Sequence, residues 1–277
     1  MLWKTSGPIL DLSTHAIVMG VLNVTADSFS DGGRFLDPQR AWDHAQTMAD
    51  AGARILDIGG ESTRPGATPV PEQEEMRRVL PIIERLSHDP RLILSIDTMK
   101  PAVARAAVRA GAAIINDVTG LRDPAMRDVV AETGAAAIAM HMQGTPADMQ
   151  RAPSYDDVVA DVREFFRQTF HASLRSGIDP MCLAFDPGIG FGKTLQHNLA
   201  LLCELPSLRI EERPLVLGVS RKSFLGIITD EPSIEARHWP TVALSAYGRQ
   251  RGASVLRVHD VLPNLEAIRA TEALAAA

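Results

Sequence analysis

Short apolar runs recur along this chain, and most of them end abruptly in a polar or charged residue. Residues 215–219 form one such run, which is followed at once by Ser220, Arg221 and Lys222. An uninterrupted apolar run of this length predicts a strand that is buried on both faces. Because a buried cation is costly unless it meets an anion, we expect acidic side chains or an anionic ligand where this strand ends.

Other apolar runs are built in the same way. They end, in chain order, at Asn23, at Asp97, at Asn116 and Asp117, at Asp186, and at the group Arg257, His259 and Asp260. In a (β/α)8 barrel, the residues that form the active face lie at the carboxyl ends of the parallel strands. The pattern therefore predicts a barrel with most of its reactive side chains at one mouth.

Eight strands alternate with eight helices in this pattern. The strands are expected near residues 17–23, 55–60, 92–97, 113–118, 136–142, 183–188, 215–220 and 255–260, and the helices near 38–51, 72–88, 100–110, 124–133, 155–175, 195–205, 234–250 and 261–275. Four helical patterns end in Gly-Ala directly before a strand, and glycine favours the left-handed conformation that closes a helix. Such alternation favours a parallel sheet.

We therefore predict an α/β protein with the (β/α)8 TIM-barrel fold, forming a single domain over residues 1–277 with its core at about 17–261. A doubly wound open sheet, which usually has fewer strands, is the alternative. Residues 24–37 and 60–71, after the first two strands, exceed the roughly 2–6 residues usual for such connections. Each loop carries hydroxyls and an arginine, so we expect lids rather than surface insertions.

The composition agrees with one large domain. The chain has 277 residues, of which 45% are hydrophobic and 22% charged. The net charge of −6 and the lack of a basic block argue against a nucleic-acid partner. Cys182 and Cys203 form no motif, which indicates a reducing compartment. No apolar run has the length of a signal core or a membrane span, so we expect a cytoplasmic protein with no membrane partner.

Five separated motifs carry a resemblance to a known family. They lie at residues 20–33 (GVLNVTADSFSDGG), 52–65 (GARILDIGGESTRP), 186–193 (DPGIGFGK), 220–223 (SRKS) and 257–260 (RVHD). In this order they resemble the signatures of the dihydropteroate synthases, a family of pterin-binding TIM-barrel enzymes, over about residues 17–261. One departure is His-Trp-Pro-Thr at 238–241, where the family more often has glycine before the threonine, which leaves the local helix start open.

The resemblance implies a transferase of tetrahydrofolate biosynthesis that depends on Mg²⁺. Members of the family condense (7,8-dihydropterin-6-yl)methyl diphosphate with 4-aminobenzoate and release 7,8-dihydropteroate and diphosphate. They are commonly homodimers and are the target of sulfonamides, and we expect both properties here. We expect a dissociative substitution in which Asp97 stabilises the developing carbon cation, with no covalent enzyme intermediate.

The substrates differ in the contacts that they need. The edge of a pterin requires carboxylate and amide groups in a dry pocket, whereas diphosphate requires cations and other hydrogen-bond donors. The resemblance implies that Asp97, Asn116 and Asp186 hold the pterin. We expect Lys222 and Arg257 to bind it too and Met140 to form an apolar wall, with a plain core role for Met140 as the alternative. Asp97, Lys222 and Arg257 are also expected to be catalytic. The candidates for diphosphate are Asn23, Thr63, Arg257 and His259, and the resemblance places Asn23 at the metal position. For aminobenzoate we expect Phe29, Thr63, Arg64, Pro65, Phe191, Ser220 and Arg221.

Three further features are interpreted without a catalytic role. Asp57, within the second strand, is expected to be a buried, hydrogen-bonded support for the first lid. The glycines at 188, 190 and 192 lack the G-x-G-x-x-G spacing, which argues against dinucleotide binding. His141 shows no metal-ligand spacing, and we interpret it as structural.

Three other functions stay open on the sequence. A folate-binding methyltransferase would share the pterin carboxylates, but it would have no use for the diphosphate ligands. A Schiff-base aldolase could use Lys222, since a neighbouring arginine would lower the pKa of that lysine. A non-catalytic pterin-binding paralogue is the third, although the chain retains every matched functional position.

Overall fold

Eight parallel strands form the centre of the computed structural model, which describes residues 1–25, 38–63 and 66–276. Within the sheet their order is β8-β7-β6-β5-β4-β3-β10-β9. They are β3 (Ile17–Asn23), β4 (Ile55–Gly59), β5 (Ile93–Asp97), β6 (Ile114–Asp117), β7 (Ala136–Met140), β8 (Leu183–Asp186), β9 (Val216–Leu217) and β10 (Val255–Val258). A parallel bridge between Phe185 and Leu215 joins the two outer strands into a barrel. The predicted (β/α)8 fold is confirmed.

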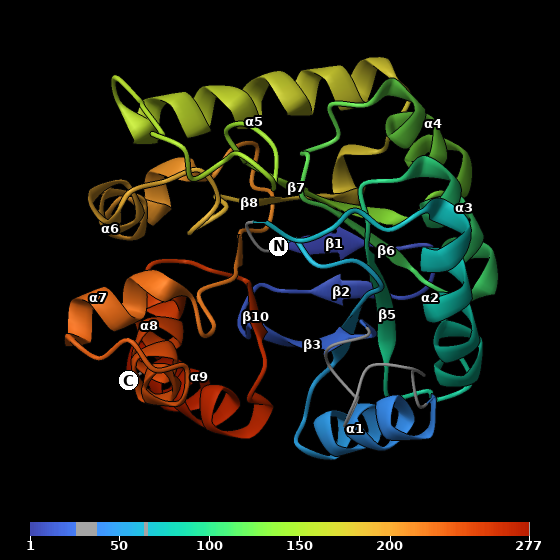
Figure 1. Cartoon of the computed structure of the whole chain (residues 1–277), viewed down its shortest axis with the longest axis horizontal. Helices are drawn as coiled ribbons and strands as arrows, with labels where there is room; N and C mark the ends of the chain where they lie inside the picture. The colour runs from blue at the N-terminus through green and yellow to red at the C-terminus, as the bar shows by residue number, and fades with distance from the viewer. Residues whose placement is uncertain (26–37, 64–65, 277) are drawn as a thin grey trace.

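Helices surround the strands, as Figure 1 shows, with α1 to α4 on one side, α5 above and α6 to α9 on the other. They are α1 (Pro38–Asp50), α2 (Glu72–Leu86), α3 (Pro101–Ala110), α4 (Pro124–Thr133), α5 (Val158–Arg175), α6 (Leu195–Cys203), α7 (Ser223–Thr229), α8 (His238–Gln250) and α9 (Val261–Ala275). The predicted boundary signals act locally. The Asp123 carboxylate accepts a hydrogen bond from the Ala125 amide at the start of α4, and Gly134 ends that helix with a φ of 64°.

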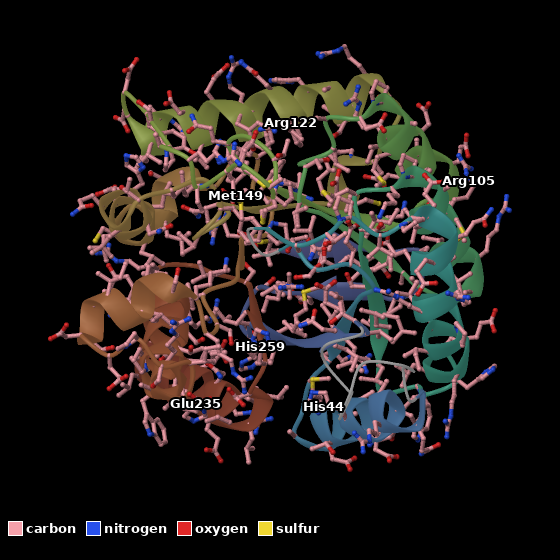
Figure 2. All side chains as sticks on the ribbon, viewed as in Figure 1. His44, Arg105, Arg122, Met149, Glu235 and His259 are labelled. Carbon is pink, nitrogen blue, oxygen red and sulfur yellow. The ribbon has the colours of Figure 1, made fainter. Side chains whose placement is uncertain are left out.

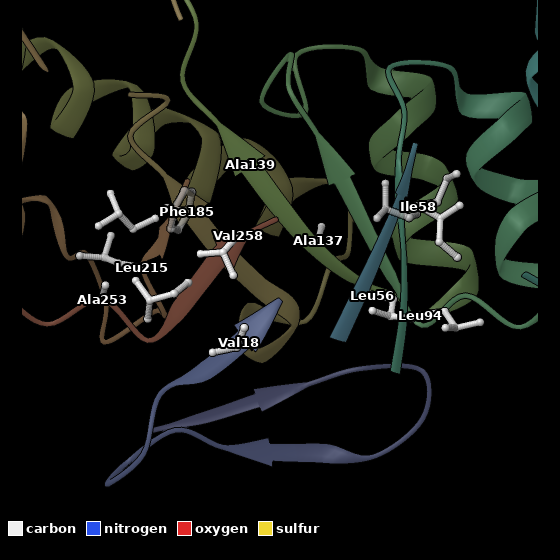
Figure 3. Close-up of a cluster of buried hydrophobic side chains, with 14 of the residues drawn as sticks. Val18, Leu56, Ile58, Leu94, Ala137, Ala139, Phe185, Leu215, Ala253 and Val258 are labelled. Atoms are coloured by element: carbon white, nitrogen blue, oxygen red, sulfur yellow. The ribbon is translucent and has the colours of Figure 1, made fainter. Parts of the chain in front are cut away.

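The alternation of side chains along each strand sorts the barrel into two apolar layers. Outward residues such as Leu56, Leu94 and Val258 belong to a large cluster that also contains buried residues of the helices (Figure 3). The neighbouring residues on the same strands, such as Ile55 and Ile93, belong to a second cluster inside the barrel. The strands are therefore buried on both faces, as their apolar runs predict.

The inward positions change character along each strand. At the amino ends they are apolar and include Met19, Ile55, Ile93, Ile114, Ala184, Val216 and Val255. At the carboxyl ends, an even number of residues later on the same side, they are Asn23, Asp57, Asp97, Asn116, Asp186, Gly218 and Arg257. Because the strands are parallel, this change places the polar groups at one mouth of the barrel.

A short hairpin that the sequence pattern does not predict closes the opposite mouth. Strands β1 (Leu2–Lys4) and β2 (Ile9–Asp11) pair antiparallel, with Trp3 opposite Leu10. Trp3 is fully buried against the inner apolar cluster, and its indole nitrogen donates a hydrogen bond to the Cys182 carbonyl over 3.0 Å. The hairpin thus seals the core at the amino ends of the strands.

Two local predictions need correction. The strand predicted over 215–220 is only Val216–Leu217, and the chain turns sharply a few residues later at Arg221, whose φ is 58°. Helix α7 then begins directly at Ser223, where no helix is predicted.

The helix predicted over 234–250 begins as a 3-10 turn (Glu235–Arg237) and becomes α8 at His238. Pro240 lies in the first turn of α8, where the amides have no partner within the helix, so the departure from the family pattern is tolerated. In the described part of the chain, no helix combines the length and apolar character that crossing a bilayer requires.

Candidate active site

The inward polar residues at the carboxyl ends of four neighbouring strands, β3 to β6, lie beside one another. Asn23 on β3 lies beside Gly59 on β4, Gly59 beside Asp97 on β5, and Asp97 beside Asn116 on β6. A Cβ at Gly59 would lie 3.7 Å from the Asn23 amide oxygen and 3.8 Å from a carboxylate oxygen of Asp97. Glycine at this position therefore lets Asn23 and Asp97 face one small space.

A buried ion-pair network joins this row to β10. The Arg257 guanidinium donates to Asp57 over 2.6 Å and to Asp97 over 2.7 Å. Asp57 is fully buried and also accepts hydrogen bonds from the Ser95 hydroxyl at 2.6 Å and the Asn116 amide at 2.9 Å. The predicted burial and hydrogen bonding of Asp57 are confirmed. Its described partners are active-site side chains, so Asp57 orients Arg257 and Asn116.

Burial controls the charge of Asp97. It raises the pKa of this carboxyl to about 7, against the opposing attraction of Arg257, and the nearby charge of Asp57 adds to the increase. Burial alone would lower the pKa of Arg257, but Asp57 and Asp97 together raise it above its usual value. Arg257 therefore stays a cation, and Asp97 exchanges its proton near neutral pH.

The second half of the mouth pairs Asp186 with Lys222 around Gly218. A Cβ at Gly218 would lie 3.8 Å from both the Asp186 carboxylate and the Lys222 ammonium, and 3.9 Å from Arg257 Cβ. Asp186 also accepts a hydrogen bond from the Gly188 amide over 2.7 Å. The missing side chain of Gly218 leaves a space that all three charged residues border.

Lys222 is positioned by the loop that follows β8. Its ammonium donates to the Ile189 carbonyl and lies 4.7 Å from the centroid of the Phe191 ring. Burial lowers the pKa of Lys222 to about 8, with Arg257 adding to the decrease and Asp186 opposing it. Burial disfavours the charged form of Asp186 as well, so it raises the pKa of this carboxyl, while Lys222 opposes that increase.

A polar group after β9 and β10 borders this mouth. The Ser220 hydroxyl lies 2.9 Å from His259 Nδ1 and accepts a hydrogen bond from the His259 amide at 3.2 Å. His259 is visible beside β10 in Figure 2. Arg221 forms a two-point ion pair with Asp260, at 2.7 and 3.2 Å, and its side chain is 41% exposed. The structure therefore joins Ser220 to His259, but it directs Arg221 to Asp260.

Apolar residues form one wall of the mouth. Met140, at the end of β7, belongs to a buried cluster with Val118, Met142 and Met149, and Phe191 packs against it. Thr63 is partly buried in the connection after β4. Phe29, Arg64 and Pro65 lie outside the described residues, as does most of the first predicted lid.

Gly218, Ser95 and Lys193 also belong to the site, although the sequence pattern does not predict them. Ser95 could have been found from its place two residues before Asp97 on the same strand face. Gly218 is the inward residue next along the predicted strand from Val216. Lys193 ends a recognised motif, but its burial depends on contacts that the motif does not encode.

Comparison with known proteins now identifies the class that this barrel and its charged mouth define. Residues 19–259 match the family of pterin-binding enzymes. The chain is 45% identical over 267 residues to the dihydropteroate synthase of Escherichia coli K12, and the match covers 96% of this chain and 94% of that protein. The chain belongs to the dihydropteroate synthase family.

Solved structures of relatives agree with this assignment. A Yersinia pestis dihydropteroate synthase in complex with a sulfonamide drug is 45% identical, with a TM-score of 0.94 and full coverage of both chains. A Xanthomonas albilineans dihydropteroate synthase with 4-aminobenzoic acid is 47% identical, with a TM-score of 0.93 and coverage of 100% of this chain and 98% of that one. The same fold is thus known with 4-aminobenzoic acid and with a sulfonamide drug.

Proposed function

We propose that this protein is a transferase that condenses (7,8-dihydropterin-6-yl)methyl diphosphate with 4-aminobenzoate, giving 7,8-dihydropteroate and diphosphate. The observation that carries the proposal is the arrangement of Asp97, Asn116, Asp186, Lys222 and Arg257 around one mouth of the barrel. A Xanthomonas albilineans relative, 43% identical with a TM-score of 0.90, was solved with 7,8-dihydropteroate. This supports the same product here.

The pterin would lie in the space over Gly218 and beside Met140. Asp186 would accept hydrogen bonds from the exocyclic amine and ring nitrogens, and Lys222 would donate to the ring carbonyl. The Asn116 amide nitrogen donates one of its two hydrogens to Asp57, which orients the side chain, and its amide oxygen would accept a hydrogen bond from the pterin. Arg257 would stack its planar guanidinium on the ring.

The reaction breaks one C–O bond and forms one C–N bond. The bonding electrons leave with diphosphate, and the dihydropterin ring delocalises the positive charge left on its methylene carbon. Asp97 in its ionised form would stabilise that charge from a largely buried position. The neutral amine of aminobenzoate then attacks the carbon with its lone pair and loses a proton. The protein supplies positioning and charge, without a covalent intermediate.

Diphosphate would be held by Asn23, Thr63, Arg257 and His259. The amide oxygen of Asn23 shares the space over Gly59 with the Asp97 carboxylate. Oxygen ligands of this kind fit Mg²⁺, which commonly takes few protein ligands and completes its shell with phosphate and water. The described residues contain no group of three or more His, Cys, Asp or Glu that could hold a metal by themselves. When bound there, Mg²⁺ would offset the negative charge of the leaving diphosphate.

The aminobenzoate would enter over the reacting carbon, between Phe191 and the segment that carries Ser220 and Arg221. Phe29, Thr63, Arg64 and Pro65 would complete this subsite. The ion pair of Arg221 with Asp260 would have to loosen if Arg221 binds the carboxylate of the acceptor. Since the Yersinia pestis relative was solved with a sulfonamide drug, we expect a sulfonamide to compete with aminobenzoate.

We also propose a cytoplasmic homodimer. Exposed apolar side chains gather on α7, at the start of α8 and in the segment between these two helices, which pack together; they include Ile227, Ile228, Ile234 and Trp239. Trp239 is 70% exposed, which is unusual for so large an apolar side chain. Sedimentation equilibrium should show a dimer that Trp239→Glu dissociates, and a wild-type monomer at micromolar concentration would refute this part.

The decisive experiment measures diphosphate release from the dihydropterin diphosphate. Release should require both 4-aminobenzoate and Mg²⁺, and dihydropteroate should form in equal amount. Release that ignores aminobenzoate would refute the proposed acceptor. Trapping of a carbonyl substrate on Lys222 by borohydride would instead favour the Schiff-base aldolase.

A further inference from the structure

The loop between β8 and α6, residues 187–194, is held by side chains at four successive carbonyls. Lys222 donates to the Ile189 carbonyl, Gln150 to that of Gly190 at 2.7 Å, Lys193 to that of Phe191 at 2.9 Å, and Tyr155 to that of Gly192 at 2.8 Å. Gln150 and Tyr155 come from the connection between β7 and α5, Lys222 follows β9, and Lys193 belongs to the loop itself. The loop is therefore fixed along its length, although it forms no regular structure.

Lys193 is the most deeply buried of these donors, with only 3% of its surface exposed. Its ammonium lies 2.9 Å from the Phe191 carbonyl, 3.0 Å from His141 Nδ1 and 3.2 Å from the His141 carbonyl. An ammonium has three hydrogens, and these three acceptors match them. His141 directly follows Met140 of β7, so Lys193 connects the end of that strand to the loop that carries Phe191.

Two glycines allow this connection. A Cβ at Gly188 would lie 1.9 Å from the His141 carbonyl oxygen, and a Cβ at Gly192 would lie 2.6 Å from the Gln143 carbonyl oxygen. Both glycines have positive φ, at 64° and 61°. The backbone of the loop thus packs directly on residues 141–143, within reach of a single lysine side chain.

The site of Lys193 is unfavourable for its charge but rich in hydrogen-bond acceptors. Burial lowers the pKa of Lys193 well below its ordinary value, with Lys222 adding to the decrease and Asp186 opposing it. Methionine has a comparable unbranched stem, so Lys193→Met would keep the packing and remove the hydrogen bonds to the His141 ring, the His141 carbonyl and the Phe191 carbonyl. Loss of the donor to buried acceptors should cost some stability, so a positioning role has to be separated from a structural one by kinetics.

We propose that Lys193 is a positioning residue for the acceptor subsite, which it serves by fixing Phe191 relative to Met140. Phe191 packs against the cluster that contains Met140, and its ring faces the ammonium of Lys222. Lys193 touches neither substrate and acts through the loop. This inference rests on the proposed function, in which Phe191 contacts aminobenzoate.

The first test is Lys193→Met in the full-length protein, with steady-state kinetics for both substrates. We expect KM for aminobenzoate to rise about tenfold, as for the loss of one well-placed interaction, while kcat and KM for the pterin change less than about threefold. The melting temperature should fall modestly, because buried acceptors lose their donor, so the kinetics are measured at a temperature where the variant is fully folded. An unchanged KM for aminobenzoate, or an equal loss for both substrates, would overturn the inference.

A double-mutant cycle with Phe191→Leu separates positioning from general damage. If Lys193 acts through the Phe191 ring, Lys193→Met should add less than about a twofold change in the Phe191→Leu background. Effects that multiply would overturn the inference. Val129→Ala, in the core beneath α4, serves as the control, since it should lower the melting temperature and leave both KM values unchanged.

Tyr155→Phe provides a second route if Lys193→Met does not fold. It removes only the hydroxyl that donates to the neighbouring Gly192 carbonyl, and we expect a smaller rise of KM for aminobenzoate, about threefold. No rise would count against the loop as a positioning device. A wild-type protein that fails to release diphosphate would refute the proposed function itself, whereas an active wild type with normal Lys193→Met kinetics would refute only this inference.

Discussion

The two mouths of the barrel are built from the same eight strands, yet they serve opposite purposes. At the amino ends, Trp3 closes a dry cluster with Met19, Ile55 and Ile93. At the carboxyl ends, Asp57, Asp97 and Arg257 hold charges below the surface. On β4 the change from Ile55 to Asp57 takes two residues, about 7 Å of strand. Stability and reactivity are thus separated along each strand.

The largest effect on activity is expected from Asp97→Asn at the charged mouth. The substitution keeps the shape of the side chain and removes the negative charge that would stabilise the carbon cation. We expect kcat to fall by about 10²–10³, the range seen when one group that stabilises transition-state charge is lost. Pterin binding, measured by calorimetry, should weaken much less. Equal losses in binding and turnover would contradict the role of Asp97.

The matching change at the apolar mouth is Trp3→Ala. Because Trp3 is fully buried, its truncation should lower the free energy of unfolding by about 3–5 kcal/mol. Denaturant unfolding measures this loss. At low temperature, where the variant stays folded, kcat and both KM values should equal those of the wild type. A selective loss of activity in folded protein would show that the two mouths are coupled.

A smaller effect is expected from Gly218→Ala. The added methyl would make only ordinary contacts, at 3.8 Å from both Asp186 and Lys222, so the fold should tolerate it. It would nevertheless occupy space that the proposed pterin site needs. We expect KM for the pterin substrate to rise about tenfold, with little change in melting temperature. A large loss of stability with normal KM would place the ligand elsewhere.

The smallest effect concerns pH. Asp97, with a pKa of about 7, must be ionised, and Lys222, with a pKa of about 8, must be protonated. The profile of kcat/KM should therefore fall below about pH 7 and above about pH 8. Asp97→Asn should flatten the acidic side of the profile. An acidic side that persists in that variant would point to another titrating group.

The carboxyl of Asp97 should also make the stability of the folded protein depend on pH. The pKa of Asp97 is raised on folding from its model value of 3.8, so the folded protein holds this proton more tightly than the unfolded chain does. Its contribution is complete at low pH and is lost as the pH rises from about 4 to about 7. Relative to Asp97→Asn, the wild type should therefore lose stability over this range in thermal unfolding. The ionised form of Asp97, which the proposed reaction needs, therefore lowers the free energy of unfolding near neutral pH.

The sequence predicted the strands well because each apolar run ends in a polar residue at the same mouth. The residues Asn23, Asp97, Asn116, Asp186, Lys222 and Arg257 were found in this way, and the structure brings them together. The hairpin β1–β2 was missed because three-residue strands give too little alternation to detect. The partners of Asp57 were missed because Arg257 lies 200 positions away in the chain.

The side of the barrel where the sheet closes has a consequence for ligand binding. Strand β9 has only two residues, and a single bridge from Leu215 to Phe185 links it to β8. So few backbone bonds make this seam the place where the wall should separate most readily. Asp186 lies on one side of the seam and Lys222 on the other. A pterin that binds both residues would therefore hold β8 and β9 together and stabilise the closed barrel.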